Sequence, residues 1–201
     1  MSARIVNLLA GPGAGKSTLA SGVFHHLKKE GVNCEFVHEF AKELAWENRS
    51  EALQDQVYIL GNQMRMLHRC MKQVDVIITD TSILYGIIYA RKYHQSPYPK
   101  EFESLVLSAF RHMDNLNFYV KREKPYSLIG RYQTEDDARD LDTRIHCALI
   151  DYGIPYITVS GNDDGMLKVL EEIKRCLNGG ITDGPMQPDL FGGDTPTRNE
   201  K

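Results

Sequence analysis

The chain has 201 residues, and its 24 Lys and Arg against 27 Asp and Glu give a formal net charge of −3. This is the length of one domain that can bury a sizeable core, and the negative charge opposes nucleic-acid binding over the surface as a whole. The sequence lacks an apolar stretch of the roughly 20 residues that span a membrane, and Met1 to Arg4 lead into a strand without a secretory signal, so we expect a cytoplasmic protein. Neither zinc nor a disulfide framework is indicated, because the four cysteines are isolated from one another: Cys34, Cys70, Cys147 and Cys176.

Apolar runs suited to buried strands alternate with longer stretches of helical periodicity. The strands are expected at residues 4–9, 34–38, 76–80, 117–120 and 154–159. Helices are expected from residues 16–18 to 31, over about 41–73 with a break near 48–50, and over 83–93, 101–113, 134–152 and 163–177. This alternation predicts a parallel β-sheet covered by helices.

Two cap patterns and one change of composition mark the second half of the chain. Thr134, with Asp137 three residues later, is typical of a capped helix start, and Asp163 or Asp164 is expected to cap the last helix. From Asn178 the composition changes to Gly, Pro, Asp and Thr without periodicity. We therefore expect a folded domain over residues 1–177 and a flexible tail over residues 178–201.

A phosphate-binding loop follows the first expected strand. The stretch from Ala10 to Thr18 reads Ala-Gly-Pro-Gly-Ala-Gly-Lys-Ser-Thr, and a helical pattern begins at its end. In such a loop small residues let successive N–H groups surround phosphate oxygens, Lys16 neutralises the β- and γ-phosphates, and Ser17 offers its hydroxyl to Mg²⁺. Ala10 stands where the usual pattern has Gly and still supplies a small side chain. The residues expected to bind ATP are Gly11, Pro12, Gly13, Ala14, Gly15, Lys16, Ser17 and Thr18.

The rest of the chain decides between classes of nucleotide-binding protein. Switch GTPases need a guanine-reading Asn-Lys-x-Asp after a strand, whereas residues 121–124 read Lys-Arg-Glu-Lys. Motor ATPases normally have a larger chain and end their second-metal strand in an acidic pair, whereas the strand at 76–80 ends in the single acid Asp80. The class that remains is the small kinases.

Three features beyond the loop resemble the P-loop nucleoside and nucleotide kinase group, and within it a phage-type branch similar to the ribosylnicotinamide kinases. Glu39 follows the second expected strand, where such kinases place an acid beside the acceptor hydroxyl. Gln63 precedes Asp80-Thr81-Ser82, as a substrate-reading Gln precedes an Asp-Arg-Ser-like strand end in those kinases. Arg131 and Arg139 lie in and after a polar segment suited to a lid over the phosphates.

The resemblance covers residues 4–161 and implies a three-layer αβα sandwich with a five-stranded parallel sheet and an arginine-bearing lid. Because the carboxyl ends of parallel strands face the ligand crevice, Glu39 is the residue we expect to orient or deprotonate the acceptor. Asp80 is expected either to hold Mg²⁺ through water or to share the role of base. Gln63 and Tyr85 are expected to bind the substrate together with Glu39, and ATP with Mg²⁺ is the expected phosphoryl donor.

The sequence departs from the kinase pattern at one phosphate-binding position. Thr81 stands where many nucleoside kinases have Arg, so another cation is expected over the migrating phosphoryl group. Arg131 and Arg139 are preferred for this role as catalytic residues. The other basic residues that can compensate are Lys121, Arg122 and Arg144. Aromatic side chains that can sandwich a base are Trp46, Tyr58 and Tyr85.

The tail contains Gln187-Pro188-Asp189-Leu190-Phe191, which resembles the short peptide that bacterial replication and repair proteins use to dock on the sliding clamp. Gln187, Leu190 and Phe191 are its expected anchors on the clamp. Together with the phage-type resemblance, this peptide points to a kinase that phosphorylates 5-hydroxymethyluracil or 5-hydroxymethylcytosine within DNA, a step of base hypermodification. The base must leave the duplex stack for this reaction. The alternatives are a small-molecule nucleoside or nucleotide kinase and a non-catalytic, nucleotide-dependent adaptor.

Overall fold

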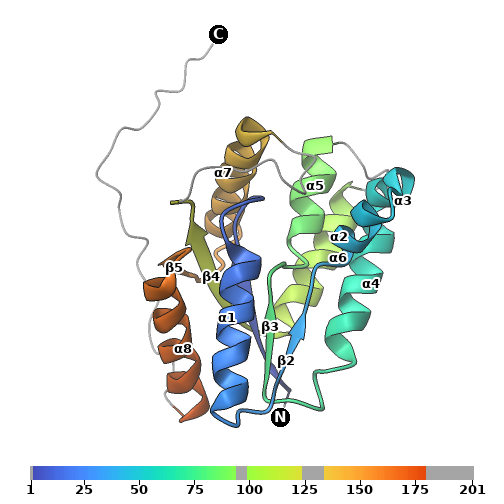
Figure 1. The fold of residues 1–201 in the computed structure, drawn as a ribbon. Helices are drawn as coiled ribbons and strands as arrows, with labels where there is room; N and C mark the ends of the chain where they lie inside the picture. Colours follow the sequence, from blue (N-terminus) through green and yellow to red (C-terminus); the bar gives the residue numbers. More distant parts are fainter. Residues whose placement is uncertain (1, 94–98, 124–133, 180–201) are drawn as a thin grey trace.

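A computed structural model describes residues 2–93, 99–123 and 134–179 of the chain. Five parallel strands form one sheet in the order β2-β3-β1-β4-β5 (Figure 1). The strands are β1 (Arg4–Leu9), β2 (Cys34–Val37), β3 (Val76–Thr79), β4 (Asp114–Lys121) and β5 (Ile157–Ser160). The predicted five-stranded parallel sheet is therefore confirmed, and β4 is longer than residues 117–120 because it pairs with β1 from Asp114 onward.

Helices cover both faces of this sheet, which confirms the three-layer sandwich. The helices are α1 (Lys16–Lys29), α2 (Phe40–Trp46), α3 (Ser50–Gln54), α4 (Gln56–His68), α5 (Tyr85–Tyr93), α6 (Pro99–Arg111), α7 (Glu135–Asp151) and α8 (Asp163–Leu177). One core contains Val6 and Leu8 of β1 with the apolar faces of α1 and α8, and the other contains Ile5 and Leu9 with those of α4 to α7. Alternate β1 side chains thus point to opposite layers. Figure 1 shows α1 and α8 side by side on one face.

Several expected boundaries are wrong, and three of the differences have a local cause in the structure. The segment from 41 to 73 is interrupted a second time at Asp55, whose side chain accepts a hydrogen bond from the Tyr58 N–H and caps α4. The last helix is capped by Asn162, which accepts from the Gly165 N–H at 3.0 Å, rather than by Asp163 or Asp164. The helix expected from residue 83 begins at Tyr85, after a turn in which the Tyr85 N–H donates to the Ser82 carbonyl oxygen. By contrast, the capping box of Thr134 and Asp137 is present.

The strand order places a crevice at the carboxyl edge of the sheet. After β1 the chain forms β2 and β3 on one side of β1, and after β3 it crosses to form β4 on the other side. The connections that follow β1 and β3 therefore run in opposite directions from the centre of the sheet. Ligands of such sheets bind at this switch point. None of the helices in the described residues combines the length and apolarity that a bilayer crossing requires.

Candidate phosphate-transfer site

The loop between β1 and α1 has the backbone of a phosphate cradle. Gly13 and Gly15 have φ angles of 81° and 98°, in the left-handed region that favours glycine. Gly11 is needed for a different reason, because a Cβ there would clash with the carbonyl oxygen of Ala138 and lie 2.8 Å from Asp142 Oδ1. Helix α7 therefore packs directly on the loop, a contact that the loop motif alone does not predict.

Tyr85 fixes the start of the loop from the other side. Its buried hydroxyl accepts from the Ala10 N–H and donates to the Ala10 carbonyl oxygen, both at 2.9 Å. Burial raises the pKa of Tyr85 well above its ordinary value, so the hydroxyl keeps the proton that it donates. The ring lines the cavity as expected of a substrate-binding residue, but the hydroxyl is committed to the loop.

An ion pair between Asp142 and Arg122, which the sequence did not predict, holds the outer turn of the loop. Asp142 of α7 accepts from the Gly11 N–H at 2.5 Å and from Arg122 Nε at 2.8 Å. Arg122, which follows β4, also donates from Nη2 to the Pro12 carbonyl oxygen at 2.7 Å. The two side chains are only 8% and 14% exposed. Sequence reasoning named Arg122 as one compensating cation, but no local pattern pointed to Asp142.

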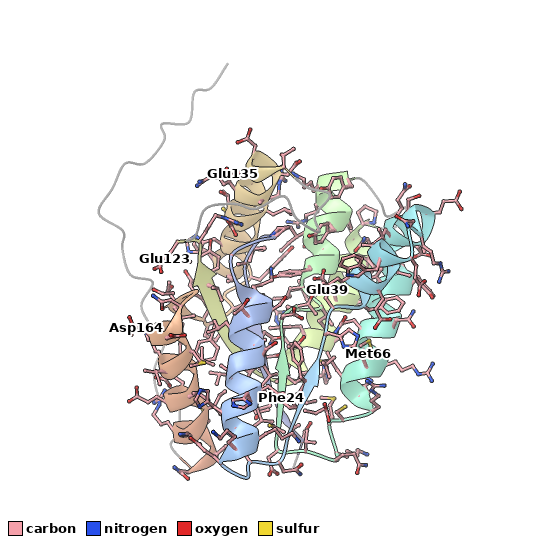
Figure 2. All side chains as sticks on the ribbon, viewed as in Figure 1. Phe24, Glu39, Met66, Glu123, Glu135 and Asp164 are labelled. Atoms are coloured by element: carbon pink, nitrogen blue, oxygen red, sulfur yellow. The ribbon has the colours of Figure 1, made fainter. Side chains whose placement is uncertain are left out.

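Three charged side chains converge at the inner edge of the loop. Lys16 Nζ donates to the Gly11 carbonyl oxygen at 3.0 Å, and Glu39 and Asp80 act on it electrostatically. Burial lowers the pKa of Lys16, while the two carboxylates oppose that shift. Burial likewise raises the pKa of Glu39, while Lys16 opposes the shift. Figure 2 labels Glu39 at the carboxyl end of β2, where α2 begins.

Ser17 and Asp80 fit the expected Mg²⁺ site. The Ser17 hydroxyl donates to Asp80 Oδ2, so the side chains of α1 and the β3 end meet directly. The other oxygen, Asp80 Oδ1, is buried and has no hydrogen-bond partner among the residues that the structure describes. A hydroxyl beside one carboxylate, completed by phosphate and water oxygens, is a donor set that Mg²⁺ prefers.

Gln63 occupies the neighbourhood expected of it, but its amide bonds to the protein backbone. Gln63 Oε1 accepts from the Phe40 N–H at 2.9 Å, and Nε2 donates to the His38 carbonyl oxygen at 3.2 Å. These two backbone groups flank Glu39. Gln63 is 5% exposed and lines the cavity.

A cavity of about 620 Å³ extends from the loop between α2, α4 and α5. Tyr85, Tyr89 and Tyr93 recur every fourth residue along α5 and line one wall, with adjacent ring centroids 6.3 and 6.0 Å apart. Trp46 lines the opening and is 70% exposed. Away from the loop, the rest of the lining combines apolar side chains with polar ones: Ala41, Ala45, Leu53, Ile59, Leu60 and Ile83, together with Lys42, Gln56, Gln63, Thr81 and Ser82. Sequence reasoning identified Trp46 and Tyr85 and missed Tyr89 and Tyr93, although their helical spacing is visible in the chain.

The expected lid residues are only partly described. Arg139 lies on α7 and pairs with Glu135 at 2.7 Å on the exposed surface, and it is not among the described residues that line the cavity. Arg144 pairs with Asp140 in the same way. Tyr58 packs edge to face on Phe40. Arg131 and the tail residues Gln187, Leu190 and Phe191 lie outside the described residues.

Comparisons with known proteins agree with this architecture. Residues 5–164 match the model of a family described as an AAA domain, and no curated protein matches the sequence. Among the solved structures that match is the crystal structure of NadR protein in complex with NR, with a TM-score of 0.60 and 17% identity. That match covers 92% of this chain and 53% of the other, so the chain spans about half the length of that protein. At this identity the likeness shows the fold alone.

Proposed function

This chain belongs to the AAA-domain family whose model it matches, and we propose that it is an ATP-dependent kinase that phosphorylates an alcohol. One observation carries the proposal: Lys16 of the phosphate loop and Glu39 line the same cavity, and Asp80, which accepts a hydrogen bond from Ser17, acts on both of them electrostatically. A phosphoryl donor fits the loop side, and an acceptor fits the other side. The likeness to NadR protein, whose structure was solved with NR, supports a kinase of the nucleoside or nucleotide type.

The geometry assigns a task to each of these side chains. Lys16 neutralises the charge on the transferred phosphoryl group, and the loop N–H groups hold the phosphates in line. Glu39, on the acceptor side, orients the hydroxyl and accepts its proton as the hydroxyl oxygen bonds to the γ-phosphorus; the bond from that phosphorus to the β–γ bridging oxygen breaks, and ADP leaves. Ser17 and Asp80 would hold Mg²⁺, which supplies further neutralisation of phosphate charge when bound.

For the acceptor, we propose the hydroxymethyl group of a 5-hydroxymethylpyrimidine carried in DNA. The ring wall of Tyr85, Tyr89 and Tyr93 offers π faces to a planar base, and the cavity is within the size range of sites for one small ligand. Trp46 stands exposed at the opening, where it can stack on a base adjacent to a flipped one. The clamp-like peptide of the tail supports a substrate on DNA.

A free nucleoside is the second candidate, and the charge around the opening favours it. In the segment that contains Trp46, from α2 to the cap of α4, four acidic residues outnumber the basic Lys42 and Arg49, and such an excess of negative charge repels DNA phosphates. The acidic residues are Glu43, Glu47, Glu51 and Asp55. Such a rim does not hinder a neutral nucleoside.

A transfer assay separates these functions. The protein is incubated with γ-labelled ATP and Mg²⁺ together with one acceptor: an oligonucleotide carrying 5-hydroxymethyluracil or 5-hydroxymethylcytosine, the matched unmodified oligonucleotide, or the free nucleosides. Label in modified DNA alone supports the DNA acceptor, and label in a nucleoside supports the second candidate. ATP binding without transfer to any acceptor would support the nucleotide-dependent adaptor and contradict the kinase.

Two variants test the roles on the loop and acceptor sides. Lys16→Ala is expected to abolish transfer because phosphate charge is no longer neutralised, and Glu39→Gln is expected to lose turnover while ATP affinity is retained. Normal turnover by Glu39→Gln would show that the base assignment is wrong.

The tail peptide is proposed as a docking peptide for a bacterial sliding clamp. Replacing Leu190 and Phe191 with Ala is expected to abolish clamp binding in a titration while transfer to short oligonucleotides stays intact. Unchanged clamp affinity of that variant would rule the docking out.

A further inference from the structure

Glu39 is the N-cap residue of α2, yet its side chain does not cap the helix. The first N–H groups of a helix have no partner within the helix and need an acceptor from elsewhere. A short N-cap side chain such as Asp or Ser can accept from the second or third of these N–H groups, and the first needs an acceptor elsewhere. Here the Glu39 carboxylate lies among the groups around Lys16 and Asp80 instead, so another group must satisfy the start of α2.

The side-chain amide of Gln63, one turn before the end of α4, satisfies this start. Its oxygen accepts from the N–H of Phe40, the first residue of α2, and its NH₂ donates to the carbonyl oxygen of His38. The amide therefore holds both peptide groups on either side of Glu39. Gln63 is 5% exposed, and a buried backbone group that loses its hydrogen bond is costly.

We propose that Gln63 is a positioning residue: by bonding the Phe40 N–H and the His38 carbonyl oxygen, it fixes the backbone on both sides of Glu39 and so directs the Glu39 carboxylate to the reacting groups. The inference rests on the proposed function, in which Glu39 acts on the acceptor hydroxyl. It also gives Gln63 a role other than reading the substrate, because one oxygen and one N–H of its amide are directed to the backbone of residues 38 and 40.

The charged and titratable groups that face Glu39 make its position consequential. Lys16 attracts its carboxylate and Asp80 repels it, while Lys42 lies on the same helix. Tyr85 and Tyr89 face it from α5. Without the Gln63 amide, the Phe40 N–H competes with Lys16 for the Glu39 carboxylate and draws it away from the reacting groups. A shift of about 1 Å in a reacting group can lower the rate about a hundredfold.

The test compares Gln63→Met, Gln63→Glu and Gln56→Met in the full chain. Methionine has a similar length and makes neither hydrogen bond, whereas glutamate keeps an acceptor oxygen for the Phe40 N–H. Gln56 is the matched control, because it lies two turns earlier on α4, is also 5% exposed and lines the same cavity. Its amide donates instead to the Leu53 carbonyl oxygen.

Hydrogen exchange of the Phe40 amide is measured first, because it requires no acceptor. Protection of this amide is expected to be lost in Gln63→Met and kept in Gln63→Glu and in Gln56→Met. Next, kcat is measured with whichever acceptor takes label in the transfer assay, and ATP affinity is measured by titration. Gln63→Met is expected to lose about a hundredfold in kcat with unchanged ATP affinity, and Gln63→Glu to recover part of it.

Each contrary result has a distinct meaning. Unchanged Phe40 exchange in Gln63→Met would overturn the inference, as would lost protection with unchanged kcat. A raised KM for the acceptor with Phe40 still protected would show that Gln63 reads the substrate. If Glu39→Gln turns over normally, the proposed function fails at the base, and the exchange result still reports whether Gln63 caps α2.

Discussion

Removing the Asp142 carboxylate tests how strongly the phosphate loop depends on its ion pair. Asp142→Ala removes the carboxylate to which Arg122 Nε and the Gly11 N–H donate. Both partners of the pair are largely buried, so solvent screening does not reduce the effect. Breaking such a buried pair from one side costs about 3–5 kcal/mol, and for a chain of this size we expect a melting temperature lower by roughly 6–20 °C.

A surface acid on the same helix provides the control. Asp140 pairs with Arg144 at 2.8 Å and also with Lys92, but its side chain is 38% exposed, so Asp140→Ala is expected to cost at most about 1 kcal/mol for each pair. The double variant Arg122→Met with Asp142→Leu removes both charges of the pair, and it should recover much of the loss because the pair is replaced as a unit by apolar side chains.

The assay is urea unfolding followed by circular dichroism, together with titration of ATP and Mg²⁺. We expect Asp142→Ala to bind ATP more weakly as well, because the pair holds the backbone of Gly11 and Pro12. If Asp142→Ala unfolds at the same urea concentration as Asp140→Ala, the pair does not stabilise the loop and the reasoning is refuted.

Three further predictions follow from the loop and from Glu39. Gly11→Ala places a Cβ against an α7 carbonyl oxygen and should cost about 1–3 kcal/mol in unfolding free energy. Gly61→Ala is the control, because its Cβ would meet no described atom within 4 Å, and its effect on the unfolding free energy should be neutral or stabilising. Tyr85→Phe leaves the Ala10 N–H and carbonyl without the hydroxyl and should cost about 1–3 kcal/mol in the same unfolding assay. Because burial raises the pKa of Glu39 and turnover needs its carboxylate, kcat should fall with decreasing pH at a midpoint above the ordinary glutamate value of about 4.3. A midpoint at or below that value in the pH–rate profile would contradict the assigned role.

Local patterns in the sequence were sufficient for the phosphate loop and the sheet. The small residues and Lys16-Ser17 form a cradle through backbone geometry that the residues themselves impose, and Gly13 and Gly15 adopt the positive φ angles that such a turn needs. Apolar strands alternating with amphipathic helices predicted the parallel sheet, because burial on both faces requires that pattern. The position of Glu39 and Asp80 at the strand ends followed from the same topology.

Only the tertiary structure decided what surrounds that cradle. The partners of Gly11 and Ala10 come from α7 and α5, more than 70 residues away in the chain, and no local periodicity encodes such contacts. Gln63 matched a family position for reading substrate, yet packing of α4 against the start of α2 directs its amide to the backbone. A sequence pattern records which groups are available, whereas the hydrogen bonds that each group makes depend on which distant segments the fold brings within about 3 Å.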